Sequence, residues 1–141
     1  PVLGFHTAGF HRVEQHERRA LSRPLGKDLD WNGSGMHSNF STKHLREVGG
    51  KEYFEALMAA FDKNLMDHIE VYGPDNDKRL TGKHETAPWN QFSYGVSNRG
   101  ASIRIPWQVA KDGKGYAEDR RPNANMDPYT VCRLLLETVC G

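Results

Sequence analysis

The clearest pattern of hydrophobic positions lies between Gly50 and Val71. Apolar side chains recur there at steps of three and four residues, which is the spacing of one face of an α-helix. They are Tyr53, Phe54, Leu57, Met58, Phe61, Leu65 and Ile69. Gly73 and Pro74 follow, and glycine just past a helix end with proline behind it commonly marks a C-terminus. The pattern therefore predicts one amphipathic helix over 50–71 with its apolar stripe in the core.

A second helix is predicted near the C-terminus. Asp127 is a favoured N-cap residue, and Pro128 is tolerated at the first helical position. The side expected to be buried consists of Val131, Leu134, Leu135 and either Thr138 or Val139. Short segments between the two helices alternate polar and apolar residues with period two, as strands do. The order of loop, strand, helix, short strands and helix predicts an α+β fold.

Charged residues in these short segments follow the strand period. In SIRIP the alternation turns Arg104 away from the two isoleucines. In AEDRRP it predicts two opposite pairs, Glu118 with Arg120 and Asp119 with Arg121. A carboxylate beside a guanidinium suits a polyanion with its metal ion, because arginine offers a planar fork and glutamate holds the cation. An ion-pair ladder on an exposed strand would have the same pattern, so the residues alone leave both interpretations open.

Two histidine-containing segments are less specific. The turn-forming run NGSG leads into MHSNF, where alternation places His37, Asn39 and Ser41 on one face. A lone histidine of this kind is more often a hydrogen-bonded side chain than a ligand. His11 and His16 lie five apart, which is not the spacing of a helical zinc pair, so a solvated turn or disordered lead-in is favoured.

Composition restricts the function classes. The chain has 141 residues, of which 37% are hydrophobic and 26% charged, so it suits one globular domain or part of a larger one. A formal net charge of +1 provides no basic field for nucleic acid, and any anion site must be local. No apolar run approaches the roughly 20 residues of a membrane span, and no secretory leader is evident. We therefore expect a soluble, cytoplasmic protein. The first residue, Pro1, indicates a processed or truncated chain.

The two cysteines agree with this expectation. Cys132 and Cys140 lie eight residues apart in the predicted C-terminal helix, about 12 Å of rise, which is too far for them to bridge each other. A chain without a disulfide framework favours a reducing compartment.

Four motifs in order resemble the catalytic domain of glutamine synthetase, of the type shared by eukaryotes and some bacteria. They are DWNGSGMHSNFST, RLTGKHET, FSYGVSNRGASIRIP and YAEDRRPNANMDPY. The resemblance covers residues 24–141 and leaves 1–23 as an unmatched lead-in. It implies the C-terminal portion of that catalytic domain, in which antiparallel strands line the site and helices flank them.

The resemblance also implies roles for individual residues. The ligands of a divalent ion, Mg²⁺ or Mn²⁺, would be His37 and Glu118. The glutamate substrate would be held by Asn32, Gly33, Arg79 and Arg120. ATP and the transferring phosphoryl group would contact Asn39, Ser41, Arg99, Arg104 and Tyr116. Glu85 would be the flap carboxylate that closes the site and deprotonates ammonium, and Arg99 is the other residue expected to be catalytic.

The implied reaction is ATP-dependent ligation of ammonia to L-glutamate through γ-glutamyl phosphate. Phosphoryl transfer demands mainly positioning and charge neutralisation, which arginines and a metal ion supply. Ammonium becomes a nucleophile only after losing a proton, which a carboxylate such as Glu85 can accept. The partners implied are glutamate, ammonium, ATP and further copies of the chain in a ring, with neither nucleic acid nor a membrane.

The chain departs from the family in two ways. Ala117 stands where a bulky aromatic residue is common. The family's other metal-ligating glutamates and its small N-terminal β-grasp domain lie upstream of the matched part, so we expect strands 99–106 and 116–122 to lose sheet neighbours and expose edges. Two alternatives follow: a non-catalytic fragment or relative that acts as a structural or binding module, and an ATP-dependent amine ligase with another acceptor.

Overall fold

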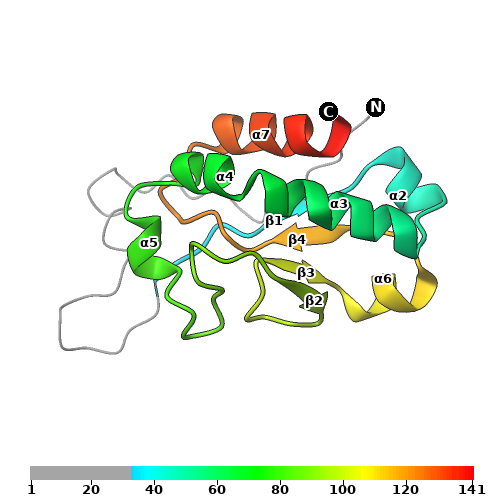
Figure 1. The fold of residues 1–141 in the computed structure, drawn as a ribbon, viewed down its shortest axis with the longest axis horizontal. Coiled ribbons are helices and arrows are strands. Elements are labelled where there is room, and N and C mark those ends of the chain that lie inside the picture. Colours follow the sequence, from blue (N-terminus) through cyan, green and yellow to red (C-terminus); the bar gives the residue numbers. More distant parts are fainter. Residues whose placement is uncertain (1–32) are drawn as a thin grey trace.

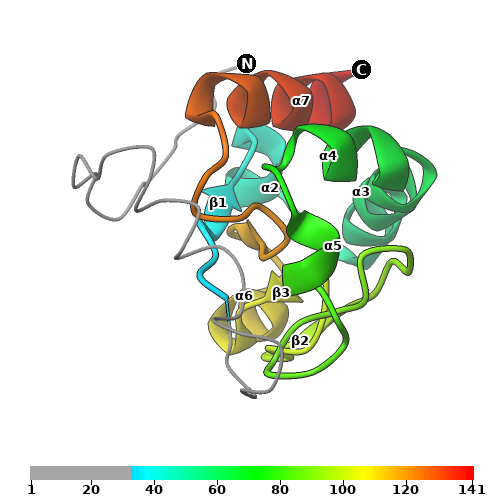
Figure 2. The ribbon, with the colours of Figure 1, turned by 90° about the vertical axis from the view of Figure 1, so that its left-hand side faces the viewer.

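The computed structural model describes residues 33–141 as a small sheet covered by helices. The elements in order are β1 (Ser38–Phe40), α2 (Lys43–Glu47), α3 (Lys51–Lys63), α4 (Leu65–Val71), α5 (Asn76–Arg79), β2 (Tyr94–Val96), β3 (Ile103–Ile105), α6 (Trp107–Asp112), β4 (Ala117–Asp119) and α7 (Pro128–Cys140). Helices α3, α4 and α7 lie together on one side of the strands, with α7 in contact with both others (Figures 1 and 2). The mixed α and β content confirms the coarse fold prediction.

The four strands form one sheet in the order β1-β4-β3-β2. Strand β4 is antiparallel to both β1 and β3, whereas β2 is parallel to β3. The prediction of antiparallel strands is therefore correct around β4 and wrong for β2. The prediction of exposed edges at β3 and β4 is also wrong, because β1 and β2 of the same chain pair with their outer sides and form the edges of the described sheet.

The helix predicted over 50–71 is two helices. Asn64 lies between α3 and α4 with φ −98° and ψ 18°, and its N–H bonds to the carbonyl of Ala60 as a helix C-cap does. Asparagine side chains compete with helical hydrogen bonding, which suits such a break. In α4, His68 is fully buried, whereas Leu65 and Ile69 are only half-buried.

The predicted stop at the end of α4 and the predicted N-cap of α7 are both confirmed. The chain leaves α4 through Tyr72 and Gly73, and Gly73 has a φ of 109°. In α7, the carboxylate of Asp127 accepts a hydrogen bond of 3.0 Å from the N–H of Tyr129. Of the residues predicted to be buried in α7, the first three are buried: Val131, Leu134 and Leu135.

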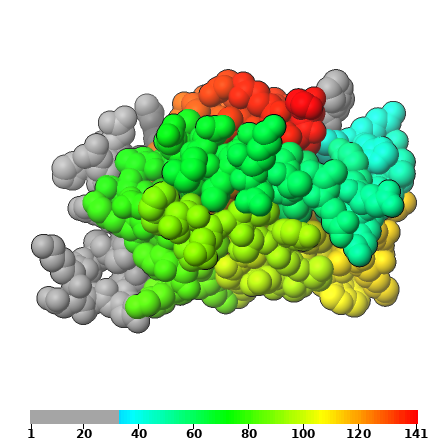
Figure 3. Space-filling view, viewed as in Figure 1, coloured from blue at the N-terminus to red at the C-terminus, as the bar shows by residue number. Residues whose placement is uncertain are grey.

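The core lies between these helices and the strands. Phe40 of β1 and Phe61 of α3 meet with ring centroids 5.0 Å apart, and the isoleucines of β3 complete the sheet side. The space-filling view shows α7 (red) directly against α3 and α4 (green) (Figure 3). No helix within 33–141 is long and apolar enough to cross a membrane. Both cysteines are free thiols, as the spacing predicted.

Candidate functional site

Strand β4 and its neighbours bring four of the predicted site residues together. Glu118 Oε2 accepts hydrogen bonds from Arg104 Nε at 2.5 Å and from Arg120 Nη1 at 3.1 Å. Its other oxygen, Oε1, lies 3.5 Å from His37 Nδ1. The strand period predicted that Glu118 and Arg120 share a face. Pairing of β3 with β4, which places Arg104 opposite Glu118, adds the second arginine.

The neighbouring side chains change the pKa of Glu118. Burial alone would raise the pKa of Glu118, but hydrogen bonds from His37, Arg104 and Arg120 outweigh it and lower the pKa to about 2. The carboxylate is therefore ionised at neutral pH. Its side chain is 10% exposed, compared with 29% for Arg104 and 35% for His37, so the cluster opens to solvent on one side.

The donors present suit only part of a divalent-ion site. Within residues 33–141, no three histidine, cysteine, aspartate or glutamate side chains gather closely enough to hold a metal ion. His37 and Glu118 are near each other, but Mg²⁺ takes about six ligands and usually recruits several carboxylates or waters. The described residues thus do not form a complete metal site.

Arg79 is buried beneath the backbone that follows β4. Its Nη1 donates to the carbonyl of Arg121 at 2.9 Å, and its Nη2 donates to the carbonyl of Arg120 at 3.0 Å. Burial and the neighbouring Arg120 lower the pKa of Arg79 to about 10. A Cβ at Gly35 would lie 2.1 Å from Arg79 Nη2, so only glycine allows this close approach. Arg79 here supports the backbone that carries Arg120.

Glu85 and Arg99 meet at the surface, where Glu85 Oε1 lies 3.6 Å from Arg99 Nη1. Both His84 and Glu85 have left-handed backbone conformations, with φ of 52° and 58°. Such conformations are uncommon for residues other than glycine and cost free energy. The carbonyl of Arg99 accepts from Arg120 Nε at 3.0 Å, which joins this loop to the Glu118 cluster.

The structure places the remaining predicted contacts on separate segments of the chain. Asn39 is half-buried and lies opposite Glu118 in the β1–β4 pairing. Ser41 is buried, and its hydroxyl donates to the carbonyl of Gly115 at 2.5 Å. Tyr116 is 41% exposed, whereas its neighbour Ala117 is fully buried in the core. Gly33 is half-buried, and Asn32 lies outside the described residues.

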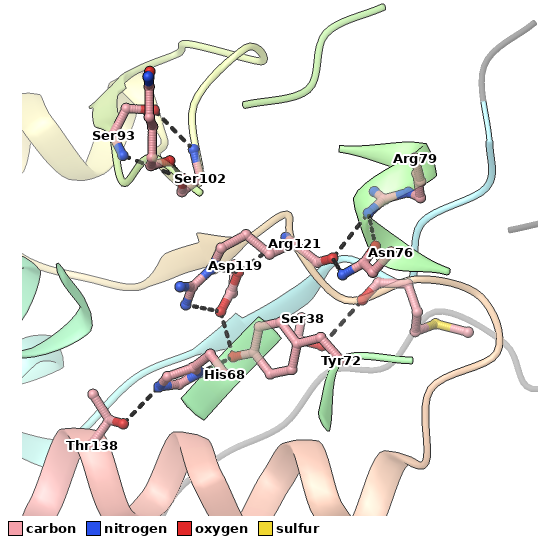
Figure 4. A network of polar contacts seen from close by, with 12 residues as sticks. Ser38, His68, Tyr72, Asn76, Arg79, Ser93, Ser102, Asp119, Arg121 and Thr138 are labelled. Carbon is pink, nitrogen blue, oxygen red and sulfur yellow. Dashed lines mark hydrogen bonds and ion pairs between the residues drawn. The ribbon is translucent and has the colours of Figure 1, made fainter. Parts of the chain in front are cut away.

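The opposite face of β4 carries a second charged cluster, drawn in Figure 4. Asp119 Oδ2 accepts from Tyr72 at 2.6 Å and from Arg121 Nη2 at 2.7 Å, while Oδ1 accepts from Arg121 Nε at 2.9 Å. Arg121 also lies over three aromatic rings, with distances of 5.2 to 5.8 Å from its central carbon to the ring centroids. Burial would raise the pKa of Asp119, but the charge and hydrogen bonds of Arg121 lower it.

His68 extends this buried cluster to α7. Tyr72 gives its only hydroxyl proton to Asp119, so it accepts from His68 Nδ1–H, and His68 Nε2 then accepts from Thr138 at 2.7 Å. The imidazole is thus neutral, because burial and nearby Arg121 lower its pKa to about 4. Sequence analysis missed Tyr72 and His68. Their i, i+4 spacing just before a helix end was the available signal.

The chain is similar to curated glutamine synthetases. It is 73% identical to the enzyme of Bradyrhizobium diazoefficiens over 118 residues, which cover 83% of this chain and 34% of that relative. It is 60% identical over 137 residues to the Streptomyces viridochromogenes protein and 57% identical over 132 residues to the Saccharomyces cerevisiae protein. Those matches cover 94% and 93% of the chain, but 38% and 36% of the relatives.

The chain therefore spans about a third of the length of the curated relatives it matches. No protein-family model matches the chain. The resemblance predicted from the four motifs is confirmed by these relatives.

Proposed function

Because the chain is a relative of the glutamine synthetases that spans about a third of their length, we propose that it forms the C-terminal portion of such a catalytic domain. The complete enzyme would ligate ammonia to L-glutamate with ATP, through γ-glutamyl phosphate. The observation that carries the proposal is the convergence of Arg104, Arg120 and His37 on Glu118.

This convergence suits phosphoryl transfer to a carboxylate. Two guanidinium groups on one side of a sheet provide fixed positive charge for the phosphates and for the substrate carboxylate. Glu118 binds both guanidinium groups through one oxygen, Oε2, and with His37 it would contribute two ligands to Mg²⁺ or Mn²⁺. The remaining ligands would come from the part of the relatives that this chain does not span.

The other predicted contacts remain part of the proposal. Glutamate would meet Asn32, Gly33, Arg79 and Arg120, and ATP would meet Asn39, Ser41, Arg99, Arg104 and Tyr116. Strands β1, β3 and β4 would then line the site. The complete protein would act in the cytoplasm as a homo-oligomeric ring.

Glu85 would serve the second half-reaction. Its carboxylate lies at the surface beside Arg99, where it can attract ammonium and then accept its proton. The ion pair with Arg99 holds this carboxylate within the same network as Arg120. Closure of the loop would keep water from the acyl phosphate.

The incomplete donor set favours a second candidate for the 141 residues alone, namely a binding or structural module without activity. We expect the isolated chain to make no glutamine, because two ligands do not satisfy a divalent ion. Glutamine formation by the isolated chain near the rate of a complete relative would contradict this expectation.

A chimera tests the proposed activity. The matching 118 residues of the Bradyrhizobium diazoefficiens enzyme would be replaced by those of this chain, and glutamine formation would be measured. We expect a rate within about ten-fold of the parent enzyme. In the same chimera, Arg120→Lys should raise the KM for glutamate by roughly ten- to a hundred-fold, since lysine lacks the bidentate fork. A folded, correctly assembled chimera without activity would refute the proposal.

A further inference from the structure

Tyr72 binds both ends of the segment that carries Arg120. Its hydroxyl donates to Asp119 Oδ2 at 2.6 Å, and its carbonyl accepts from the N–H of Asn123 at 2.9 Å. Tyr72 and Asp119 are both fully buried, so neither bond competes with water. One residue thus anchors positions 119 and 123, and Arg120 lies between the two anchors.

Two residues shortly after Tyr72, Asn76 and Arg79, also bind the middle of the segment. Asn76 Nδ2 donates to the carbonyl of Arg121 at 2.8 Å, beside the bonds from Arg79 to the carbonyls of Arg120 and Arg121. The backbone after β4 therefore has its carbonyls and both ends held by residues 72–79, as the labelled side chains of Figure 4 illustrate.

Gly73 allows the two segments to approach this closely. A Cβ there would lie 2.0 Å from Asn123 Oδ1, and the φ of 109° also favours glycine. Asn123 in turn donates through Nδ2 to the carbonyl of Pro74 at 2.7 Å. The Asn123 side chain thus lies against the backbone of residues 73 and 74, beside the bond from its own N–H to the carbonyl of Tyr72.

We infer that Tyr72 is a positioning residue for Arg120 and Glu118. Asp119, the last residue of β4, lies between these two residues and points to the opposite face, so holding its side chain limits movement of the backbone that joins them. Removing the Tyr72 hydroxyl leaves Arg121 as the hydrogen-bond partner of the Asp119 side chain and loosens the guanidinium groups that bond to Glu118. The substrate role of Arg120 rests on the proposed function, whereas the positioning itself does not.

Hydrogen exchange of arginine side chains in the 141-residue chain tests the inference. The Nε–H groups of Arg104 and Arg120 are both hydrogen-bonded, so NMR can follow their exchange with solvent. In Tyr72→Phe we expect both to exchange about ten-fold faster, the lower end of what one hydrogen bond to a charged group is worth. Backbone amides of α3 should keep their protection.

Two control variants separate positioning from general destabilisation. Tyr53→Phe removes a hydroxyl whose partner is Thr42, at 3.1 Å, and should leave both Nε–H rates unchanged. Val131→Ala creates a core cavity in α7 and should lower the melting temperature without a selective change at the two arginines. If Tyr72→Phe does not fold, Thr138→Val, which removes the far end of the His68 link, provides the milder test and should give a smaller rise.

The outcomes also separate this inference from the proposed function. Unchanged Nε–H exchange in a folded Tyr72→Phe chain, or equal changes in Val131→Ala, would overturn the positioning role whether or not the chimera is active. In an active chimera, Tyr72→Phe should raise the KM for glutamate, through Arg120, and the KM for ATP, through Arg104, each several-fold. A fall in kcat alone, with both KM values intact, would also contradict it.

Discussion

The two faces of β4 carry the same chemistry in different surroundings. On one face Glu118 bonds to two arginines and lies near a histidine, and the group opens to solvent. On the other face Asp119 bonds to Arg121 and Tyr72, and all three are almost completely buried. A carboxylate and guanidinium therefore meet twice within four residues, once beside solvent and once in the core.

The two ion pairs differ in whether the arginine can release its carboxylate partner and bind a ligand instead. A buried ion pair that loses a partner leaves an uncompensated charge, so the Asp119 cluster is committed to the fold. Arg104, whose side chain is 29% exposed, can exchange the Glu118 carboxylate for a phosphate or another carboxylate at less desolvation cost than a buried arginine. Of two similar ion pairs on one strand, the buried pair of Asp119 therefore stabilises the fold, whereas the pair of Glu118 is available to ligands.

Breaking the buried pair should give the largest effect. Asp119→Asn leaves Arg121 charged in the core, and we expect unfolding free energy to fall by about 3 to 5 kcal/mol. Urea denaturation of the 141-residue chain would measure it. A loss equal to that of Glu118→Gln would show that the two faces do not differ as described.

Lowering the pH should have the second-largest effect on stability, through His68 in the buried cluster. His68 has a pKa of about 4 in the folded chain and about 6.5 when unfolded, so below pH 6.5 the unfolded state binds the proton first. Stability should fall by roughly 3 kcal/mol as the pH falls from 6.5 to 4, and this contribution should then level off. Denaturation across that range would test it, with His68→Gln expected to flatten the slope. An identical slope in both chains would contradict the prediction.

Glu118→Gln should have a smaller effect on stability. The amide keeps an acceptor for the arginines, so we expect a smaller loss than for Asp119→Asn. In the active chimera the same change should weaken activation by Mg²⁺ much more than it weakens folding. A large loss of unfolding free energy with unchanged activation by Mg²⁺ would contradict the assignment of Glu118 to a ligand site.

The exposed Glu85 to Arg99 pair should matter least for folding. Both side chains are more than half exposed, and pairs of this kind contribute about 0 to 1 kcal/mol. Glu85→Ala should therefore leave the denaturation midpoint nearly unchanged. In the chimera it should spare acyl-phosphate formation and slow its capture by ammonia. Glutamate-dependent ATP cleavage that falls as far as glutamine synthesis would contradict this assignment.

Local patterns predicted much of the fold. The cap at Asp127, the stop at Gly73 and the buried stripe of α3 depend on near neighbours in the sequence, and each is present. The alternation of Glu118 and Asp119 also follows from strand geometry alone. The candidate site came from the four motifs of the resemblance, because spacing alone did not separate a ligand site from an ion-pair ladder.

Contacts between distant segments were not predictable in this way. His68 is buried between Tyr72 and Thr138, and Tyr72 reaches Asp119 across 47 positions of the sequence. Arg79 is committed to backbone carbonyls 41 and 42 positions away. Helical and strand periods predict which face of an element is apolar. They do not predict which polar side chain or carbonyl will be the hydrogen-bond partner of a buried polar group.

The sequence by itself determined the family resemblance, the main helices and the alternating faces of β4, since these depend on residue identity and local period. Only the tertiary structure decided that β2 runs parallel to β3, that β3 and β4 lie inside the described sheet, and that residues 72–79 hold the segment after β4. The physical reason is that a buried polar group must find a partner wherever the fold brings one, and sequence distance places no restriction on that partner.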